Sequence, residues 1–356
     1  MGARMKGERQ QKDDPNKEER PFKYNTGDRT LGIEMSQSAS VASAAAEFLA
    51  EGEPRKGKVN RDRTYSRRPG ERQAFLVLRD GAGERSLQRA EPGVYPAGPC
   101  LIRGEEWLLA PEVATLYSSW MSCSDEEQAE RILQRIYHRL RAAAADLLES
   151  ADGVWAAVAL LYTPELAARP ARLAALQDAQ LDALFAAALH SQRLGGDSRI
   201  DLLAPYPASL EEFAAQREFI EGVAEQTLGH AYAAACRIGA LLAPDVGQAA
   251  AGEIARIADF LVLDGAAGEA APGESAAEGF AQAAAGVLAA VRRVRPAAAV
   301  LAAGAPAAYA LADLYEIGLS GIFCSAAQRT EALLRAACLT WIARQEHSDA
   351  AAGSWQ

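Results

Sequence analysis

Histidine and cysteine, two residues that often build catalytic and metal sites, are scarce in this chain. Its 356 residues include four histidines and five cysteines. The cysteines form no C-x-x-C pair and have no neighbouring histidine, so neither a zinc site nor a disulfide framework is indicated. Unpaired cysteines suit a reducing compartment, and we expect a cytoplasmic protein.

Long apolar runs are also missing. No run reaches the roughly 18 residues that a membrane-spanning helix needs, and the chain opens without the pattern of a signal peptide. The net charge is −10, and residues 73–356 carry 21 Lys and Arg against 35 Asp and Glu. An acidic body lacks the positive surface that phosphate backbones require. We therefore expect neither a membrane nor a nucleic acid as partner.

The first 72 residues differ from the rest in charge. They hold 16 Lys and Arg against 12 Asp and Glu, with few periodic apolar residues. This composition is typical of disorder, and we predict a disordered or weakly helical segment over residues 1–72. Ser36–Ala50 consists of good helix formers and can form a short helix. Met35, directly before it, is a candidate for an alternative translational start.

Strand-like and helix-like segments alternate from about Gln73 to Arg344. Apolar residues make up 49% of the chain, which is enough for a sizeable core. The runs Gly239–Leu242 and Phe260–Leu263 are apolar on both faces, as in a parallel sheet covered on both sides. Further strands are predicted at 74–78, 100–102, 107–109, 113–117, 154–162, 200–204, 298–302 and 321–324, and helices at 124–149, 173–190, 210–228, 275–294, 306–317 and 326–344.

Regular alternation of this length predicts an α/β fold, namely a (β/α)8 TIM barrel or an incomplete barrel of the same type with fewer than eight units. A doubly wound open sheet is the alternative, but no G-x-G-x-x-G turn follows any predicted strand. We assign residues 73–112 to a short β-rich lead-in, 113–346 to the barrel and 347–356 to a tail.

Several short motifs follow one another in a characteristic order between Val113 and Arg344. Thr115–Trp120 and Ser124–Gln128 are similar to G-L-Y-R-T-E and S-E-E-E-Q, Leu203–Glu212 to M-x-P-M-x-S-S-V-E-E, Ile238–Leu242 to I-G-I-M-I-E-T-P, and Ala258–Leu261 to V-D-F-F-S-I-G-T-N-D. In this order and spacing they resemble the phosphoenolpyruvate-binding TIM barrel of enzyme I of the sugar phosphotransferase system and of pyruvate phosphate dikinase. The resemblance implies a barrel that dimerises.

The same resemblance implies that the family's site has been lost. In the family the arginine of G-L-Y-R-T-E helps to hold the substrate phosphate, and Ser118 stands at that place. The glutamate of I-E-T-P and the aspartate of T-N-D bind magnesium, and Ala243 and Ala267 occupy those places. The cysteine of the C-G-E motif falls on Leu301 or Ala302. Phosphoryl transfer depends on positioning and on cations, so these losses together remove the mechanism.

Two aspartates remain as candidate metal ligands. Asp245 and Asp264 follow successive predicted strands, and magnesium can bind through one or two carboxylates with water. The favoured interpretation is structural, with Asp245 as a helix cap and Asp264 in a turn. Trp120 replaces an acidic residue of the family and could fill the vacated pocket. We place four residues at the mouth of this pocket: Ser118, Trp120, Ala243 and Ala267.

The functional hypothesis from the sequence is a non-catalytic interaction or regulatory protein, a pseudoenzyme with no catalytic residues and no cofactor. We expect a protein partner and a homodimer. One alternative is a phosphoenolpyruvate-related phosphotransferase or lyase-type enzyme, with Mg²⁺ relocated to Asp245 and Asp264. Another is a sensor that binds an anion without a metal.

Overall fold

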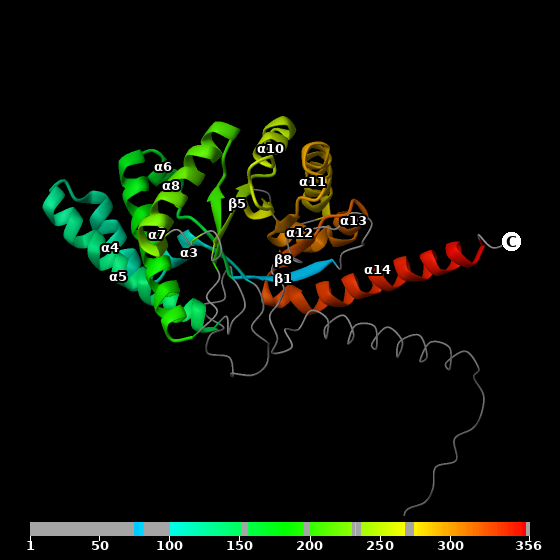
Figure 1. Cartoon of the computed structure of the whole chain (residues 1–356), viewed down its shortest axis with the longest axis horizontal. Coiled ribbons are helices and arrows are strands. Elements are labelled where there is room, and N and C mark those ends of the chain that lie inside the picture. Colours follow the sequence, from blue (N-terminus) through cyan, green and yellow to red (C-terminus); the bar gives the residue numbers. More distant parts are fainter. Residues whose placement is uncertain are drawn as a thin grey trace, which may run out of the picture. The chain divides into compact units, whose positions relative to one another are not determined.

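Eight parallel strands close into a barrel in the computed structural model (Figure 1). The structure describes residues 75–81, 100–150, 156–195, 200–229, 232, 236–267 and 274–353. The predicted disordered segment 1–72 and part of the predicted tail lie outside these residues. The strands are β1 (Leu76–Asp80), β2 (Cys100–Arg103), β3 (Ala156–Ala159), β4 (Ile200–Pro205), β5 (Cys236–Leu242), β6 (Leu261–Asp264), β7 (Val300–Ala303) and β8 (Gly321–Cys324).

The strands follow their sequence order around the barrel, and β1 closes it by pairing with β8 from Leu76 opposite Gly321. Every neighbouring pair is parallel. The predicted TIM-barrel fold is thereby confirmed, and the open-sheet alternative is wrong because the sheet has no free edge. The carboxyl ends of all eight strands consequently lie on one face of the barrel.

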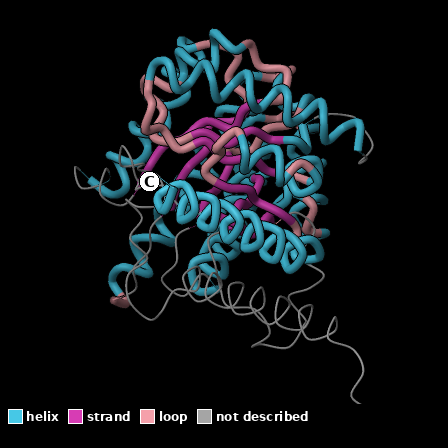
Figure 2. Tube along the Cα trace, turned by 90° about the vertical axis from the view of Figure 1, so that its right-hand side faces the viewer, coloured by secondary structure: helices cyan, strands magenta, loops and turns pink. Residues whose placement is uncertain are grey.

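Helices follow the strands and enclose them, as Figure 2 shows. Within the described residues they are α3 (Gly104–Leu108), α4 (Pro111–Ser122), α5 (Glu126–Ser150), α6 (Pro164–Ala167), α7 (Pro170–Arg193), α8 (Leu210–Leu228), α10 (Gln248–Ile254), α11 (Glu274–Val294), α12 (Ala305–Tyr309), α13 (Leu311–Glu316) and α14 (Ala326–Gly353), with a 3-10 turn at Gly265–Ala267. The boundaries of α8 match the prediction because Ser209 caps the helix, accepting a hydrogen bond from the Glu212 amide at 3.2 Å.

Side chains alternate between the inside and the outside of the barrel along each strand. Leu78, Leu101 and Val262 belong to the buried cluster inside the barrel, whereas neighbours such as Val77 belong to the larger cluster between strands and helices. Inward-facing positions recur every second residue. The residues two positions further along β1, β2 and β6 therefore also face inward, at the carboxyl ends of the strands.

The amino-terminal part of the barrel departs from the sequence prediction. The first two strands, β1 and β2, lie in the range 73–112, which the sequence predicts as a lead-in outside the barrel. The predicted strand Val113–Tyr117 is wrong, because this stretch lies within helix α4. Its apolar residues have helical spacing and Pro111 begins the helix, which outweighs the strand propensity of the run. The predicted strand 107–109 is wrong as well, since helix α3 extends to Leu108.

Candidate functional site

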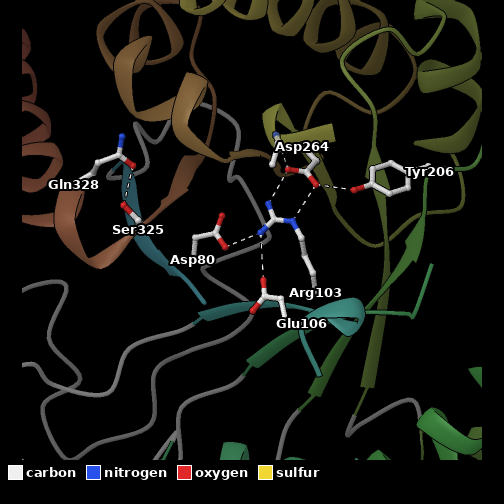
Figure 3. A network of polar contacts seen from close by, with 8 residues as sticks. Asp80, Arg103, Glu106, Tyr206, Asp264, Ser325 and Gln328 are labelled. Atoms are coloured by element: carbon white, nitrogen blue, oxygen red, sulfur yellow. Dashed lines mark hydrogen bonds and ion pairs between the residues drawn. The ribbon is translucent and has the colours of Figure 1, made fainter. Parts of the chain in front are cut away.

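A cluster of buried polar side chains lies at the carboxyl face of the barrel, the face on which TIM-barrel enzymes place their active sites. Asp80 ends β1, Arg103 ends β2 and Asp264 ends β6, each two residues after an inward-facing apolar residue. Glu106 follows on α3, and Tyr206 comes directly after β4. Figure 3 shows these five side chains pointing toward one another. We call them the mouth cluster.

Arg103 is the centre of the mouth cluster. Its Nε donates to Oδ2 of Asp264 at 3.1 Å and its Nη2 donates to Oδ1 at 2.7 Å, so the two groups form a bidentate pair. Its Nη1 donates to Oδ1 of Asp80 at 2.7 Å. Burial opposes its charge, but the carboxylates of Asp264 and Asp80 more than offset this and raise the pKa of Arg103 above its usual range. The guanidinium is therefore charged and held by two carboxylates of its own chain.

Asp264 is fully buried and its carboxylate accepts four hydrogen bonds. Two come from Arg103, one comes from the Tyr206 hydroxyl at 2.8 Å and one from the Ala266 amide at 3.0 Å. Burial by itself raises the pKa of Asp264, but the hydrogen bonds and the charge of Arg103 outweigh it, so the pKa lies below its ordinary value. Asp264 is ionised at neutral pH.

Tyr206 approaches Asp264 from the β4 side of the barrel mouth. Burial, together with the negative charge of Asp264, raises the pKa of Tyr206, so its hydroxyl stays protonated and acts as a donor. The backbone of Tyr206 has a φ of 46°, a conformation uncommon for a bulky side chain. Its amide bonds to the Leu241 carbonyl at 2.8 Å, and its ring meets that of Tyr162 edge-on at 5.6 Å. These contacts hold the hydroxyl toward Asp264.

Glu106 differs from the other carboxylates of the cluster. Its Oε1 lies 3.9 Å from Nη1 of Arg103, is buried, and has no hydrogen-bond partner among the described residues. Burial raises the pKa of Glu106 to about 7, with repulsion from Asp80 and Glu105 adding to the effect and Arg103 opposing it. Burial also raises the pKa of Glu105. The mouth cluster therefore contains a carboxyl group that changes charge near neutral pH.

The turn from β2 into α3 is packed directly onto β3. A Cβ atom at Gly104 would lie 2.7 Å from the Leu161 amide nitrogen and 2.8 Å from the Ala159 carbonyl oxygen, so no larger residue fits. The buried side chain of Gln180 accepts from the same Leu161 amide at 2.7 Å. This packing fixes the direction in which Arg103 and Glu106 leave the backbone.

We expect Tyr206→Phe to lower the free energy of unfolding by about 1.5 kcal/mol, because the variant loses one hydrogen bond to a buried carboxylate. The bidentate pair of Asp264 with Arg103 remains, which limits the loss. Urea denaturation at pH 7 measures the effect. Tyr162→Phe is the matched control, since it keeps the ring contact with Tyr206 and removes no hydroxyl from the mouth cluster. Equal losses in both variants would contradict the role assigned to the Tyr206 hydroxyl.

The two aspartates singled out from the sequence lie in different environments. Asp264 is a member of the mouth cluster and also accepts a hydrogen bond from the Ala266 amide in the turn that follows β6, as a turn residue does. Asp245 is exposed after β5 and takes no part in the cluster. The predicted helix cap at Asp245 is wrong, because Gly247 precedes the first residue of α10. Ala243 directly follows β5, and Ala267 ends the 3-10 turn after β6, so both follow strand ends. Among the described residues, no three His, Cys, Asp or Glu side chains come together as a group that could hold a metal ion.

Ser118 and Trp120 lie on helix α4 and not at the end of a strand, because the strand predicted for this stretch is wrong. Ser118 is exposed. Trp120 is buried, and the guanidinium of Arg172 lies 4.7 Å from the centre of its ring. Trp120 therefore packs in the helical layer. The prediction that Trp120 lies beside Ala243 and Ala267 at the pocket mouth depended on a strand at Val113–Tyr117, which is a helix in the structure.

Four members of the mouth cluster were not predicted from the sequence: Asp80, Arg103, Glu106 and Tyr206. A signal was present, because Asp80 and Arg103 each end a short apolar run, and the carboxyl end of a barrel strand is where chemistry is found. It was overlooked because the range 73–112 was not counted as barrel.

Comparisons with known proteins leave the family open. No protein-family model matches the chain, and no curated protein matches it. Among solved structures, the chain is similar to one from the tryptophan synthase α2β2 complex of the hyperthermophile Pyrococcus furiosus, with a TM-score of 0.26 and 16% identity. That match covers 58% of this chain and 91% of the other. Within the described residues, no helix combines the length and the apolar character required to cross a membrane.

Proposed function

We propose that this chain is a non-catalytic barrel, similar to the phosphoenolpyruvate-utilising enzymes, that acts by interaction or regulation. One observation carries the proposal: the guanidinium of Arg103, at the carboxyl end of β2, is bonded to Asp80 and Asp264 of the same chain. An arginine already paired in this way is not available to an anion unless a carboxylate moves or is protonated.

The position of Arg103 supports the resemblance better than the alignment made from sequence. In the family motif G-L-Y-R-T-E a glutamate follows the arginine after one residue, and Leu101-Ile102-Arg103-Gly104-Glu105 has this spacing at the end of β2. With this alignment Arg103, and not Ser118, corresponds to the family arginine, since Ser118 lies on a helix. In this alignment the family arginine is still present, and it is neutralised by carboxylates of the barrel.

Electrostatics disfavour an anionic substrate at this site. Asp80 and Asp264 hold the guanidinium from two sides, and Glu105 and Glu106 lie on the adjacent turn. A phosphate group brought to Arg103 would meet these carboxylates at short range, where like charges repel strongly. This argument also disfavours the metal-free anion sensor.

A relocated magnesium site meets a similar obstacle. The oxygens of Asp264 already accept four hydrogen bonds, two of them from Arg103, so a cation would have to displace the guanidinium. Asp245 is exposed and outside the cluster. Ala243 and Ala267, at the places where the family has magnesium ligands, offer no ligand side chains.

Isothermal titration of the purified protein with phosphoenolpyruvate, with and without Mg²⁺, tests the proposal. We expect no binding heat and no consumption of phosphoenolpyruvate. Asp264→Asn is the informative variant, because it removes one of the two negative charges that pair with Arg103 while keeping the shape of the side chain. Binding of phosphoenolpyruvate to this variant, but not to the unaltered protein, would support the view that the pairing of Arg103 with its own carboxylates closes the site.

Two other results would contradict the proposal. Turnover of phosphoenolpyruvate, or Mg²⁺-dependent heat that Asp245→Ala abolishes, would establish the relocated-metal enzyme. Heat with phosphoenolpyruvate in the unaltered protein and without metal would establish the anion sensor. With the proposed role we expect a protein partner, a homodimer and a cytoplasmic location, which affinity purification, sedimentation and cell fractionation can test.

A further inference from the structure

Helix α14 carries apolar side chains on the face that points away from the barrel. Ala332, Ala336 and Ala337 are buried on the barrel side. On the opposite side, Leu334, Trp341 and Ile342 are 45%, 38% and 47% exposed, and Cys338 lies between them, partly exposed. With 3.6 residues per turn these four positions form one line along the helix. We call Leu334, Cys338, Trp341 and Ile342 the α14 stripe.

The α14 stripe is a local concentration and not the general character of the surface. Eight large apolar residues of the described chain are exposed, and three of them belong to this stripe. Single exposed apolar residues need no explanation, but a line of them with a tryptophan typically marks a contact surface. Figure 1 shows the second half of α14 running past β1 and β8 toward the carboxyl terminus. The stripe, from Leu334 to Ile342, spans the middle of α14 (Ala326–Gly353).

The sequence offers a partner for the stripe within the same chain. In the predicted helix Ser36–Ala50, Val41, Ala45, Phe48 and Leu49 stand at positions i, i+4, i+7 and i+8. Leu334, Cys338, Trp341 and Ile342 have the same spacing. Glu47 is the one charged residue between Ser36 and Ala50. A short helix of this kind is only marginally stable in water by itself, and packing its apolar side on another apolar surface would stabilise it.

The described chain starts next to α14, which puts this segment within reach. Phe75 packs against Tyr315 of α13 with ring centres 5.6 Å apart, and α14 packs against both α13 and β1. Residues 51–74 connect the segment to this point and can span roughly 80 Å when extended. A tether of this length gives the segment a high effective concentration at α14 compared with a free molecule.

We propose that Val41–Leu49 packs as a helix against the α14 stripe of its own chain. The two stripes share their spacing, the chain enters the barrel beside α14, and the linker is long enough. The amino-terminal segment then covers an apolar surface that would otherwise face water.

Cross-linking in the full chain tests the proposal. Ala45→Cys places a thiol in the middle of the segment stripe, opposite the native Cys338, in a background where the partly exposed Cys123 is changed to serine. We expect a short bis-maleimide to join residues 45 and 338. Mixing isotopically light and heavy protein before the reaction shows whether the linked peptides come from one chain. Links within one chain support the proposal, whereas mixed-isotope links, which indicate a second copy, or no links would overturn it.

Thiol reactivity gives a second readout without a cross-linker. In the same Cys123→Ser background with Ala45 unaltered, we expect Phe48→Asp to raise the alkylation rate of Cys338 about tenfold, because the cover is then lost most of the time. Leu194→Asp is the matched control, since Leu194 is 76% exposed at the end of α7 and outside both stripes. An unchanged Cys338 rate in Phe48→Asp, or an equal rise in the control, would overturn the proposal.

Discussion

Arg103→Met lowers the free energy of unfolding by about 3 to 5 kcal/mol at pH 7, because it leaves buried carboxylates without their counter-charge. Asp264 is fully buried and takes two of its four hydrogen bonds from Arg103. Methionine fills much of the same volume, so the loss reports the missing charge and hydrogen bonds rather than a cavity. Urea denaturation followed by circular dichroism measures the change.

The pH dependence of this loss identifies its cause. In the unaltered protein the pKa of Asp264 is lowered, so Asp264 contributes stability above its unfolded pKa and this contribution is lost as the pH falls. In Arg103→Met burial dominates, and we expect the pKa of Asp264 to rise. The neutral carboxyl is then the favoured form. The difference between variant and parent is therefore largest near neutral pH and shrinks toward pH 4.

Two further variants make this prediction sharp. Arg131→Met removes an arginine that is exposed and paired with Glu127 at 2.5 Å, and exposed pairs contribute about 0 to 1 kcal/mol. Arg103→Met combined with Asp264→Asn removes both charges of the bidentate pair, and we expect it to recover part of the lost stability. A loss below 1 kcal/mol in Arg103→Met that is the same at all pH values would contradict the assigned role of the pair.

The later part of the barrel was predictable because its local signals agree with one another. Helix α8 has a cap at Ser209, an apolar face and an end at Gly229, and its predicted and observed limits coincide. Strand β8 was also predicted with its observed limits, Gly321–Cys324. The predicted helix 306–317 is divided at Ala310 into α12 and α13, a break that its apolar pattern does not reveal.

The first strands were harder to place because they are short and their surroundings are ambiguous. Strand β2 has four residues and is followed at once by the five-residue helix α3. Neither the strand alternation nor the helical spacing of apolar residues extends far enough in the sequence to be recognised. Val113–Tyr117 combines β-branched and aromatic residues, which favour strands, with helical spacing. Packing of α4 against α5 decides for the helix.

The candidate site shows where sequence reasoning ends. Asp264 was recognised as a residue at a strand end, but its main partner, Arg103, lies 161 residues away in the sequence. Only the closed barrel brings β2 and β6 within reach across its interior. The elevated pKa of Glu106 likewise depends on burial and on neighbours from β1 and β2. The sequence indicates which polar residues stand at strand ends. Which of them pair with one another, and which are charged, follows only from the closed barrel.

Glu106 makes the protein less stable as the pH rises from about 5 to 8. Its pKa is raised from 4.5 to about 7 in the folded state, so the folded protein binds a proton that the unfolded chain has released. Unfolding free energy falls with pH wherever the folded state binds more protons. At 1.36 kcal/mol per pKa unit, the rise from 4.5 to about 7 corresponds to at most about 3 to 4 kcal/mol, lost progressively as the pH rises from 4.5 to 7.

Glu106→Gln keeps the size of the side chain and removes its titration. We expect the unfolding free energy of this variant to fall less than that of the parent between pH 5 and 8, and to exceed it at pH 8. Equilibrium urea denaturation across this pH range measures both curves. Glu105→Gln is the matched comparison on the same turn. Because Glu105 adds to the raised pKa of Glu106, this variant keeps a fall in stability, but the fall is smaller and ends at a lower pH.

A parent protein whose stability does not fall between pH 5 and 8, or a Glu106→Gln variant with an unchanged slope, would show that Glu106 is ionised without cost in the folded state. Carbon-13 NMR of the glutamate side chains provides an independent measurement, since the Glu106 carboxyl signal should titrate near pH 7. Burial of Glu106 is the main cause of this behaviour, and the guanidinium of Arg103, 3.9 Å from a buried oxygen of Glu106 and already paired with two aspartates, does not offset it. Arg103 pairs closely with Asp80 and Asp264 and lies farther from Glu106, so its charge does not bring the pKa of Glu106 back to the ordinary range.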